Sequence, residues 1–524
     1  MTKRFNVTGT CIPGRHYMAN IPKKLDKVID MVAHGDYFII NRPHQYGKTT
    51  VMYLFEQQLK NNENYLVMAV SFEGISAETY KKQEPFVGVF LDQLYQCCKF
   101  KQEKQLAQSI DQAKQKISSF GLLDTFISEM VLGSQRKVVL MIDEVDKAGN
   151  NQVFLDFLGM LRKKYLKQNE GRDHSFHSVI LAGVHDIKTL KTRIRPNRAA
   201  QYNSPWNIAV NFKVDLSLSV EEIASMLQDY ASERNIPIDI SFFADTLFYY
   251  TSGHPFLVSS LCKIIDEEIL PAKSKKAWKP EDLVEAVRVF LMEDNTNFDS
   301  VIKNLENNPE LYEFVFQVIM NGSEFSYNSR NPVIHYGTIY GILKKDQAKT
   351  WIHNRIYEQL LYDYMSSKLE TSSGFPPPVT VSYIEKDGTL NIEKIIRKFQ
   401  EFMKEHYSSK DQSFLERQGR LLFLSFIRPI INGKGFDFKE VQISEEKRLD
   451  IAITFQNEKH IIELKVWHGE TYHQAGLEQL CDYLDRQNQD KGYLLIFDTR
   501  KKSGHAGDFK KIRHKDKEIL TAWV

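Results

Sequence analysis

The sequence predicts an α/β protein with a doubly wound parallel sheet in its N-terminal part and a second, smaller α/β domain near its C-terminus. Three observations support this prediction. A short apolar run, "DYFIIN" (36–41), precedes a glycine-containing loop and an amphipathic stretch. A continuous apolar run within "KVVLMIDEVD" (137–146) has the composition of a strand that is buried on both faces. Residues 436–467 alternate strand-like runs with short polar turns.

Length and composition limit the possible classes of protein. A chain of 524 residues predicts about three or four domains. Its net charge of +2 excludes a generally basic nucleic-acid binder, so any such contact has to come from a local patch. The N-terminus has no signal-peptide core, and no apolar run approaches the ~18 residues of a membrane span, so no membrane partner is expected. Five scattered cysteines indicate reduced thiols in a cytoplasmic protein.

The loop "NRPHQYGKTT" (41–50) is a candidate phosphate-binding loop. Its end, Gly47-Lys48-Thr49, matches the pattern G-x-x-x-x-G-K-[ST], although Arg42 stands where the first glycine is usual. The predicted strand, loop and helix direct backbone N–H groups and a helix N-terminus at the phosphates. Lys48 would reach the β- and γ-phosphates, and the Thr49 hydroxyl would bind Mg²⁺. The alternative is a chance G-K-T tripeptide.

The buried strand at 137–142 ends in two acidic residues, which a nucleotide site requires. Asp143 would hold Mg²⁺, mainly through its water shell, and Glu144 would polarise the attacking water. The alternative is a strand that stops at a solvated turn. A third strand, "SVILAGV" (178–184), is followed by His185 and Asp186, either of which could sense a γ-phosphate or simply end the strand.

Further along the chain the signals are weaker. A basic loop could supply a charge-stabilising finger, but a solvated loop is the favoured interpretation; its arginines are Arg193, Arg195 and Arg198. The stretch 247–266 breaks at Gly253-His254-Pro255 and continues as an amphipathic helix. It resembles the G-x-P element in the helical lid of AAA+-type signalling ATPases. His254 would then touch nucleotide, or it would only start the helix.

These features together resemble a known family. "YFIINRPHQYGKTT" is similar to the phosphate loop of the bacterial AAA-ATPase-like proteins, which are AAA+/STAND-type P-loop ATPases with the loop R-P-x-x-[FY]-G-K-[ST]. The resemblance continues through "MIDEVD", "SPWNIAVNF" and the lid, about residues 10–270, and more weakly through 336–365. It implies ATP and Mg²⁺ as cofactors and leaves the rate of turnover open. The residues implied to bind nucleotide are Arg42, Pro43, Gln45, Tyr46, Gly47, Lys48, Thr49, Thr50 and Asp143.

The resemblance and the composition together predict five segments. An AAA+-like core (1–215) is followed by a helical lid (216–280) and a winged-helix-like module (281–370). The stretch "SSKLETSSGFPPPVTVSY" (366–383) is rich in serine, glycine and proline, which favours extended chain and a domain junction. A linker (371–410) therefore precedes the C-terminal domain (411–524).

The C-terminal domain carries a second candidate site. "RLDIAITF" places Asp450 at the start of one strand, and "KHIIELKVW" places Glu463 and Lys465 on one face of the next. A hairpin-like turn between them can bring Asp450 beside Glu463. Two carboxylates and a lysine at a strand end can hold Mg²⁺ and orient a water for attack on a phosphodiester. The alternative is a half-buried strand pair with a surface ion pair.

This arrangement resembles the D…E-x-K signature of the PD-(D/E)XK nuclease superfamily, although Leu449 replaces the usual proline before the aspartate. The resemblance implies a restriction-endonuclease-like fold with a closing strand at 491–498. It also implies a catalytic role for Gln479, whose helix carries Tyr483 on the same face. Glu416 would join the metal site or lie at the surface.

The combined prediction is an ATP-driven protein with a metal-dependent nuclease-like domain. Nucleic acid is the expected partner, DNA more than RNA, and a homo-oligomer is possible. The rival is a nucleotide-switched regulator that binds nucleic acid or a protein without cleaving it. A basic segment near the C-terminus is either a phosphate contact or a solvated tail; it contains Arg500, Lys501, Lys502, Lys510, Lys511, Arg513, Lys515 and Lys517.

Overall fold

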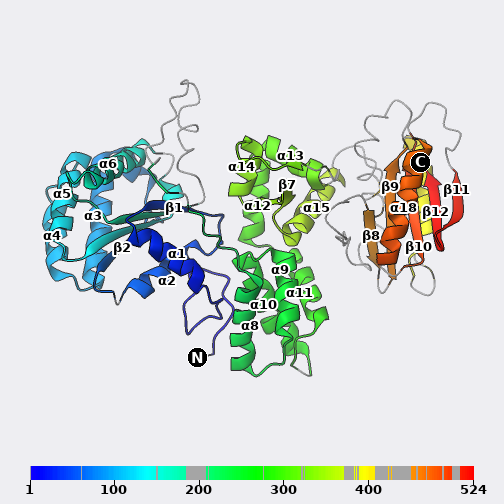
Figure 1. Ribbon diagram of the computed structural model, residues 1–524, viewed down its shortest axis with the longest axis horizontal. Helices are drawn as coiled ribbons and strands as arrows, with labels where there is room; N and C mark the ends of the chain where they lie inside the picture. The colour runs from blue at the N-terminus through cyan, green and yellow to red at the C-terminus, as the bar shows by residue number, and fades with distance from the viewer. Residues whose placement is uncertain are drawn as a thin grey trace, which may run out of the picture. The chain divides into compact units, whose positions relative to one another are not determined.

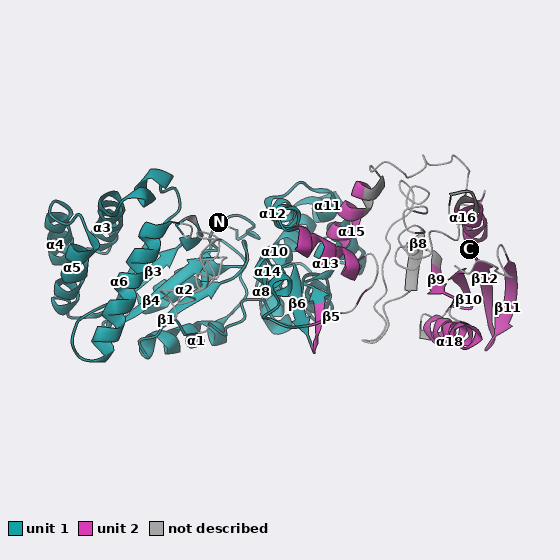
Figure 2. Ribbon diagram, turned by 90° about the horizontal axis from the view of Figure 1, so that it is seen from above, with its two compact units in different colours: residues 1–308, 327–346, 351–358 teal, residues 309–326, 347–350, 359–524 magenta. Residues whose placement is uncertain are grey.

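The computed structural model comprises two compact units, which are described separately (Figure 2). The first contains residues 1–308, 327–346 and 351–358, and the second contains residues 309–326, 347–350 and 359–524. The structure describes the chain from residue 2 to 524 except 61, 149–150, 184–207, 211, 275, 320–322, 324, 371–382, 384, 386–388, 407–422, 424–426, 428–449, 456–457, 468, 487–488 and 499–507.

The first unit is built on a parallel sheet. Among the described residues its strands follow the order β1-β4-β3-β2, and they comprise β1 (Tyr37–Asn41), β4 (Ser178–Gly183), β3 (Lys137–Asp143) and β2 (Tyr65–Ser71). All neighbouring pairs are parallel, and Ser71 is the register partner of Asp143. The predicted α/β fold with a parallel sheet is therefore confirmed. Strand β2 was not assigned from the sequence.

Helices cover both faces of this sheet (Figure 1). On one face of the sheet, Leu140 and Ile142 belong to a core shared with the helices α3 to α6. The buried Met141 between them faces the opposite side, because successive side chains of a strand alternate. Helices α1 and α2 cover that opposite side. The helices are α1 (Pro22–Ala33), α2 (Lys48–Leu59), α3 (Gln83–Phe100), α4 (Lys104–Lys114), α5 (Phe120–Leu132) and α6 (Gln152–Asn169), with short turns η1 (Ala77–Lys81) and η2 (Val145–Lys147). The sheet is thus buried on both faces, which explains its continuous apolar runs.

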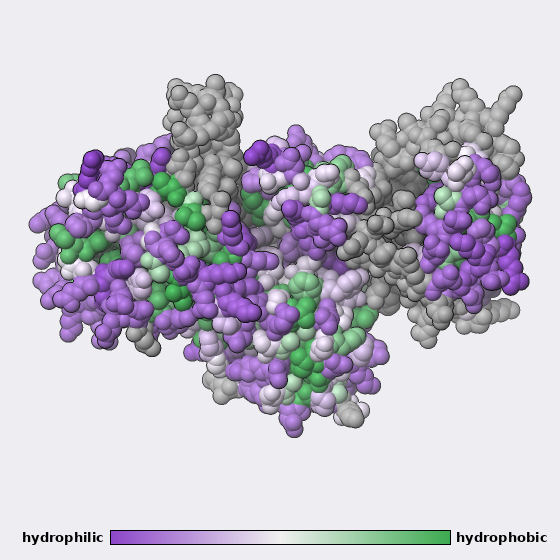
Figure 3. All heavy atoms as spheres, in the orientation of Figure 1, coloured by the Kyte–Doolittle hydropathy of each residue, from purple (hydrophilic) through white to green (hydrophobic). Residues whose placement is uncertain are grey.

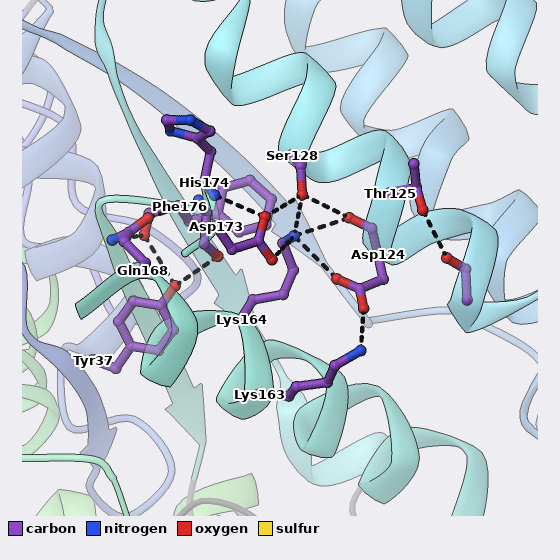
Figure 4. Close-up of polar contacts among 12 residues, drawn as sticks. Tyr37, Asp124, Thr125, Ser128, Lys163, Lys164, Gln168, Asp173, His174 and Phe176 are labelled. Carbon is purple, nitrogen blue, oxygen red and sulfur yellow. Dashed lines mark hydrogen bonds and ion pairs between the residues drawn. The ribbon is translucent and has the colours of Figure 1, made fainter. Parts of the chain in front are cut away.

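A buried lysine joins α5, α6 and the segment before β4 (Figure 4). Lys164 is fully buried, and its Nζ donates to Ser128 Oγ at 2.6 Å, to Asp124 Oδ1 at 3.0 Å and to Asp173 Oδ2 at 3.0 Å. Burial by itself would raise the pKa of Asp124, but hydrogen bonds from Lys163 and Lys164 hold that pKa below its usual value. All three lysine protons have acceptors, so the cluster is a structural ion network.

Replacing Lys164 with methionine should lower the free energy of unfolding by about 3 to 5 kcal/mol, because two carboxylates would lose their buried counter-charge. Lys163 is the matched control, since it pairs with the same Asp124 from an exposed position. Lys163→Met should cost about 1 kcal/mol or less. Urea unfolding of both variants measures the two losses of free energy of unfolding. Equal losses would show that the buried position of Lys164 adds nothing to the stability that its ion pairs provide.

A helical region follows the sheet. It contains α8 (Val220–Arg234), α9 (Ile240–Thr251), α10 (Pro255–Ile264), η4 (Ile265–Ile269), η5 (Leu270–Ala272) and α11 (Pro280–Met292). At Gly253 the backbone has a φ of +72°, and an added Cβ would lie 2.0 Å from the Leu218 carbonyl oxygen. Only glycine fits there. On the face drawn in Figure 3, hydrophobic residues gather over this region, and the exposed apolar side chains of α9 and α11 include Phe242, Phe248, Val284 and Met292.

The next segment combines helices with short strands; it is the segment for which the sequence predicts a winged-helix-like module. Its elements are α12 (Thr296–Glu306), α13 (Pro309–Ile319), β5 (Phe325–Ser326), α14 (Pro332–Ile339), β6 (Leu343–Asp346), β7 (Lys349–Ile352) and α15 (Arg355–Glu370). Strands β6 and β7 are separated by two residues, and β5 pairs with β7 in antiparallel fashion. The division into compact units passes through this segment.

The C-terminal part of the second unit is a mixed sheet with the order β11-β12-β10-β9-β8 among the described residues. Its strands are β8 (Asp450–Phe455), β9 (Glu458–Val466), β10 (Lys491–Phe497), β11 (Phe509–His514) and β12 (Lys517–Trp523). Helix α16 (Ile392–His406) packs on one face with Ile462 and Leu464, and α18 (Glu470–Arg486) packs on the other with Ile461. The predicted strand at 491–498 is present as β10.

Two stretches of this region differ from the expectation. Helix α16 lies inside the stretch 371–410 that was expected to be a linker, because Ile392, Ile395, Ile396 and Phe399 recur at helical spacing and are buried. The basic segment, for which the sequence left open a phosphate contact or a solvated tail, contributes β11 and the first residue of β12 to an antiparallel strand pair in its described part. Within β11, Phe509 and Ile512 are half-buried and the two lysines between them are exposed, whereas β12 is largely buried.

Candidate functional site

The predicted phosphate loop lies between β1 and α2, at the carboxyl end of the parallel sheet. Gly47 precedes the first residue of α2 with φ of 77° and ψ of 13°, a left-handed conformation that favours glycine. A cavity of about 700 Å³ opens here, and its lining includes Gly47, Lys48 and Thr49. The size is that of a typical small-molecule site.

Lys48 is buried beneath this loop. Its Nζ donates to the carbonyl oxygens of Arg42 at 2.8 Å and of Pro43 at 2.9 Å. Burial lowers the pKa of Lys48, while the carboxylates of Asp146 and Glu144 act in the opposite direction. The ammonium group therefore gains most from a strong anionic partner, which a phosphate would supply.

The loop and the end of β3 meet at two of the predicted metal-binding residues. Thr49 Oγ1 donates to Asp143 Oδ2 at 2.9 Å, and both residues line the cavity. The other oxygen of Asp143 accepts from the Glu144 N–H at 2.9 Å, which fixes the carboxylate. A hydroxyl and a carboxylate side by side are oxygen ligands of the kind that Mg²⁺ prefers, so the residues present fit this ion.

Glu144 directly follows β3 and also lines the cavity. Its backbone is left-handed, with φ of 55°, which is uncommon for a residue other than glycine and typical of strained functional positions. Burial raises the pKa of Glu144, and the negative charge of Asp143 raises it further. A carboxylate with a raised pKa is a better proton acceptor, as a residue that activates water needs to be.

Other residues predicted to bind nucleotide divide into two groups. Gln45, Tyr46 and Thr50 line the cavity. Arg42 and Pro43 are not among its lining residues. The guanidinium of Arg42 is instead tied to the carbonyl oxygens of Val214 at 2.6 Å and of Asn41 at 2.8 Å. The side chain of Arg42 thus anchors the loop. The backbone carbonyl oxygen of Arg42 accepts a hydrogen bond from Lys48.

The sequence did not predict the apolar wall of the cavity. Val7 and Ile21 from the N-terminal segment line it together with Leu54, Leu218 and Met226. These residues come from segments far apart in the chain, and no motif marks them. An apolar wall beside a phosphate loop suits the base of a nucleotide.

Some predicted residues lie elsewhere. His254 is buried at the start of α10 and is not among the residues that line the cavity, whereas the neighbouring Pro255 is. Several others fall outside the described residues, and these are His185, Asp186, Arg193, Arg195, Arg198 and Glu416.

The second candidate site lies in the second unit, on the face of the sheet that α18 covers. Asp450 and Glu463 are register partners in the antiparallel pair β8–β9, so the two positions are directly opposed. Glu463 is fully buried, and its Oε1 lies 2.7 Å from Lys465 Nζ. Lys465 also donates to Gln479 Oε1 at 3.1 Å, and its stem packs against Gly476.

The chemistry of this second site depends on Asp450. Within the described parts of the chain, no group of three or more His, Cys, Asp or Glu side chains is arranged to hold a metal ion. The carboxylate of Glu463 lies beside the ammonium group of Lys465. Asp450 stands at the register position directly opposite Glu463.

Comparison with known proteins assigns the first two thirds of the chain. The family described as the AAA-like domain matches residues 13–363. The chain belongs to the AAA-like domain family. The match includes the phosphate loop, β3 and the segment up to α15, and it stops before the C-terminal sheet. An AAA-like P-loop ATPase domain supports ATP binding at the first site. No curated protein matches the chain.

Solved structures of P-loop proteins are also similar to this chain, with low scores. The Walker-type ATPase of Pyrococcus abyssi has 10% identity and a TM-score of 0.46, covering 68% of this chain and 99% of its own. The ORC2 protein of Aeropyrum pernix has 10% identity and a TM-score of 0.37, with coverages of 67% and 93%. The RuvB branch migration motor of Thermotoga maritima has 14% identity and a TM-score of 0.33, with coverages of 65% and 95%.

Over the described residues, the structure contains no helix that is both long enough and apolar enough to cross a membrane.

Proposed function

We propose that the AAA-like domain binds ATP with Mg²⁺ and hydrolyses the γ-phosphate. The observation that carries this proposal is the contact between Thr49 Oγ1 and Asp143 Oδ2, 2.9 Å long, between the phosphate loop and the end of β3. Lys48 and Glu144 flank this contact in the same cavity. The arrangement supplies a cation for the phosphates, oxygens for a metal ion and a carboxylate for water.

The residues have separate tasks in this reaction. Lys48 exchanges the carbonyl oxygens of Arg42 and Pro43 for phosphate oxygens. Thr49 and Asp143 would hold Mg²⁺, which neutralises negative charge on the phosphates when it is bound. Glu144 accepts a hydrogen bond from the attacking water and orients it toward the γ-phosphorus. The apolar wall with Leu218 and Met226 packs against the base.

Replacing Glu144 with glutamine should leave ATP binding within about threefold of the parent and lower the rate of hydrolysis by about a hundredfold or more. The amide keeps the size of the carboxylate but cannot accept a proton. Glu73 also lines the cavity, and Glu73→Gln is the matched control. Binding of a fluorescent ATP analogue and release of phosphate measure the two effects. Parallel loss of binding and hydrolysis in Glu144→Gln would indicate a structural role.

We also propose that the C-terminal sheet is a metal-dependent PD-(D/E)XK nuclease-like domain that acts on nucleic acid, with DNA favoured. Support comes from the opposed positions of Asp450 and Glu463 and from the chain of contacts Glu463–Lys465–Gln479. In this proposal Asp450 and Glu463 hold Mg²⁺, and Lys465 with Gln479 orients the attacking water. ATP occupancy would gate access to this site.

One observation favours the alternative of a regulator that binds nucleic acid or a protein without cleavage. The buried charge of Glu463 is already paired with Lys465 at 2.7 Å, which is sufficient for a purely structural ion pair. Incubation of the full-length protein with mixed DNA and RNA, with and without Mg²⁺, separates the two functions. Metal-dependent fragments support the nuclease, and intact nucleic acid that remains bound supports the regulator.

A further inference from the structure

The phosphate loop is held from the outside by residues that are distant in the chain. Tyr46 is buried, and its hydroxyl oxygen lies 2.7 Å from Ser217 Oγ and 2.9 Å from His353 Nε2. Ser217 precedes α8, and His353 stands between β7 and α15. All three residues belong to the first unit. A loop residue that lines the nucleotide cavity is therefore in direct contact with the short connection between β7 and α15.

The direction of these hydrogen bonds follows from Asn354. Its Oδ1 accepts from the Tyr357 N–H at 2.8 Å, so its NH₂ group faces His353 Nδ1 at 3.2 Å. Nδ1 is then an acceptor, and in a neutral imidazole the proton sits on Nε2. Burial lowers the pKa of His353 to about 4, which keeps the ring neutral at physiological pH. His353 therefore donates to the Tyr46 oxygen, and Tyr46 donates to Ser217.

A second contact fixes the other end of the loop. A Cβ added to Gly341 would lie 2.6 Å from Cγ of Pro43, so the proline ring is seated directly on this glycine. Gly341 has a φ of +72°, which also favours glycine, and it stands just before β6. Pro43 and Tyr46 are the proline and the aromatic residue of the variant loop R-P-x-x-[FY]-G-K-[ST], which lacks the first glycine of the usual phosphate loop. Both contact the hairpin region, residues 341–357.

The same region also contacts the helices that follow the sheet. Lys344 Nζ donates to Ser252 Oγ at 2.9 Å. The Tyr357 hydroxyl donates to Asn297 Oδ1 at 2.8 Å and lies 3.3 Å from His254 Nε2. The hairpin region therefore joins the phosphate loop to the start of α10 through polar contacts. Those of the Tyr357 hydroxyl are buried, so small displacements are costly because they would leave buried groups unpaired.

We propose that the hairpin region 341–357 is a positioning element of the nucleotide site, which couples occupancy of the phosphate loop to docking of the hairpin through Tyr46 and Pro43. This inference rests on the proposed ATP binding. Lys48 has to leave the carbonyl oxygens of Arg42 and Pro43 to reach a phosphate, so the loop has to readjust. Pro43 and Tyr46 carry that readjustment to Gly341 and His353. By reciprocity, the docked hairpin alters nucleotide affinity by the same factor.

Hydrogen exchange of the full-length protein, with and without a non-hydrolysable ATP analogue, tests the proposal without any variant. Nucleotide should change exchange in residues 341–357 as well as in the loop 42–49. Tyr46→Phe removes only the hydroxyl and leaves His353 and Ser217 without that partner, so it should weaken nucleotide affinity by about five- to tenfold and abolish the effect of nucleotide on the hairpin. Tyr53→Phe on α2 is the matched control and should change neither.

The outcomes separate this inference from the proposed function. If the parent protein does not bind the analogue, ATP binding and the coupling are both wrong. If the parent binds it but exchange in 341–357 is unchanged, only the coupling is wrong. The same conclusion follows if Tyr46→Phe matches Tyr53→Phe in affinity and in exchange. Gly341→Ala, which places a methyl group against Pro43, provides a second variant and should also weaken nucleotide binding.

Discussion

Replacing Lys48 with alanine should abolish ATP hydrolysis and weaken ATP binding by about a hundredfold or more. Lys48 belongs to the phosphate loop and lines the cavity. Arg42 cannot replace Lys48, because the guanidinium of Arg42 is bound to the carbonyl oxygens of Val214 and Asn41. The alanine variant therefore lacks a positive charge at the β- and γ-phosphates. Titration calorimetry with ATP and Mg²⁺ measures the loss of affinity.

Lys60 offers a matched control for this experiment, because it directly follows the last residue of α2 and is exposed. Lys60→Ala should bind and hydrolyse ATP like the parent protein. If Lys48→Ala also behaves like the parent, the nucleotide site lies elsewhere in the molecule.

Replacing Glu463 with glutamine should abolish cleavage of nucleic acid and the stabilisation of the C-terminal sheet by Mg²⁺ or Mn²⁺. A metal ion at a hundred times its dissociation constant stabilises a site by about 2.7 kcal/mol, which corresponds to a shift of a few degrees in unfolding temperature. Glutamine keeps the size of the side chain but lacks the negative charge opposite Asp450. Thermal unfolding with and without metal ions, together with a cleavage assay, measures both losses.

ATP binding by Glu463→Gln should remain intact, because the phosphate loop belongs to the other compact unit. Glu478→Gln on the exposed side of α18 is the control and should keep both metal stabilisation and cleavage. An equal metal response in the parent and in Glu463→Gln would leave the regulator as the better account of the C-terminal domain.

The sequence predicted the parts of the fold that have strong local patterns. Strands β1, β3 and β4 are continuous apolar runs because the parallel sheet is buried on both faces, and the loop before α2 carries its own motif. Strand β2 has the same composition, but no motif stands beside it to mark it as part of the sheet. Helix α16 follows a proline-rich stretch that favours extended chain and hides the helix, although its apolar residues recur at helical spacing.

The residues of the candidate site were predictable only where they belong to short sequence motifs. Lys48, Thr49, Asp143 and Glu144 could be named in advance because each stands in such a motif. The contact between Tyr46 and His353 joins residues 307 positions apart, and no local pattern encodes it. The apolar wall from the N-terminal segment is set by tertiary packing in the same way.

The most direct test of the account is a structure of the full-length protein with a non-hydrolysable ATP analogue and Mg²⁺. The account predicts the triphosphate along Gly47, Lys48 and Thr49, with the metal ion beside Thr49 and Asp143 and the base against the apolar wall that includes Leu218. Binding of the analogue at another place, or a cavity at the phosphate loop that stays without nucleotide at saturating concentrations, would contradict it.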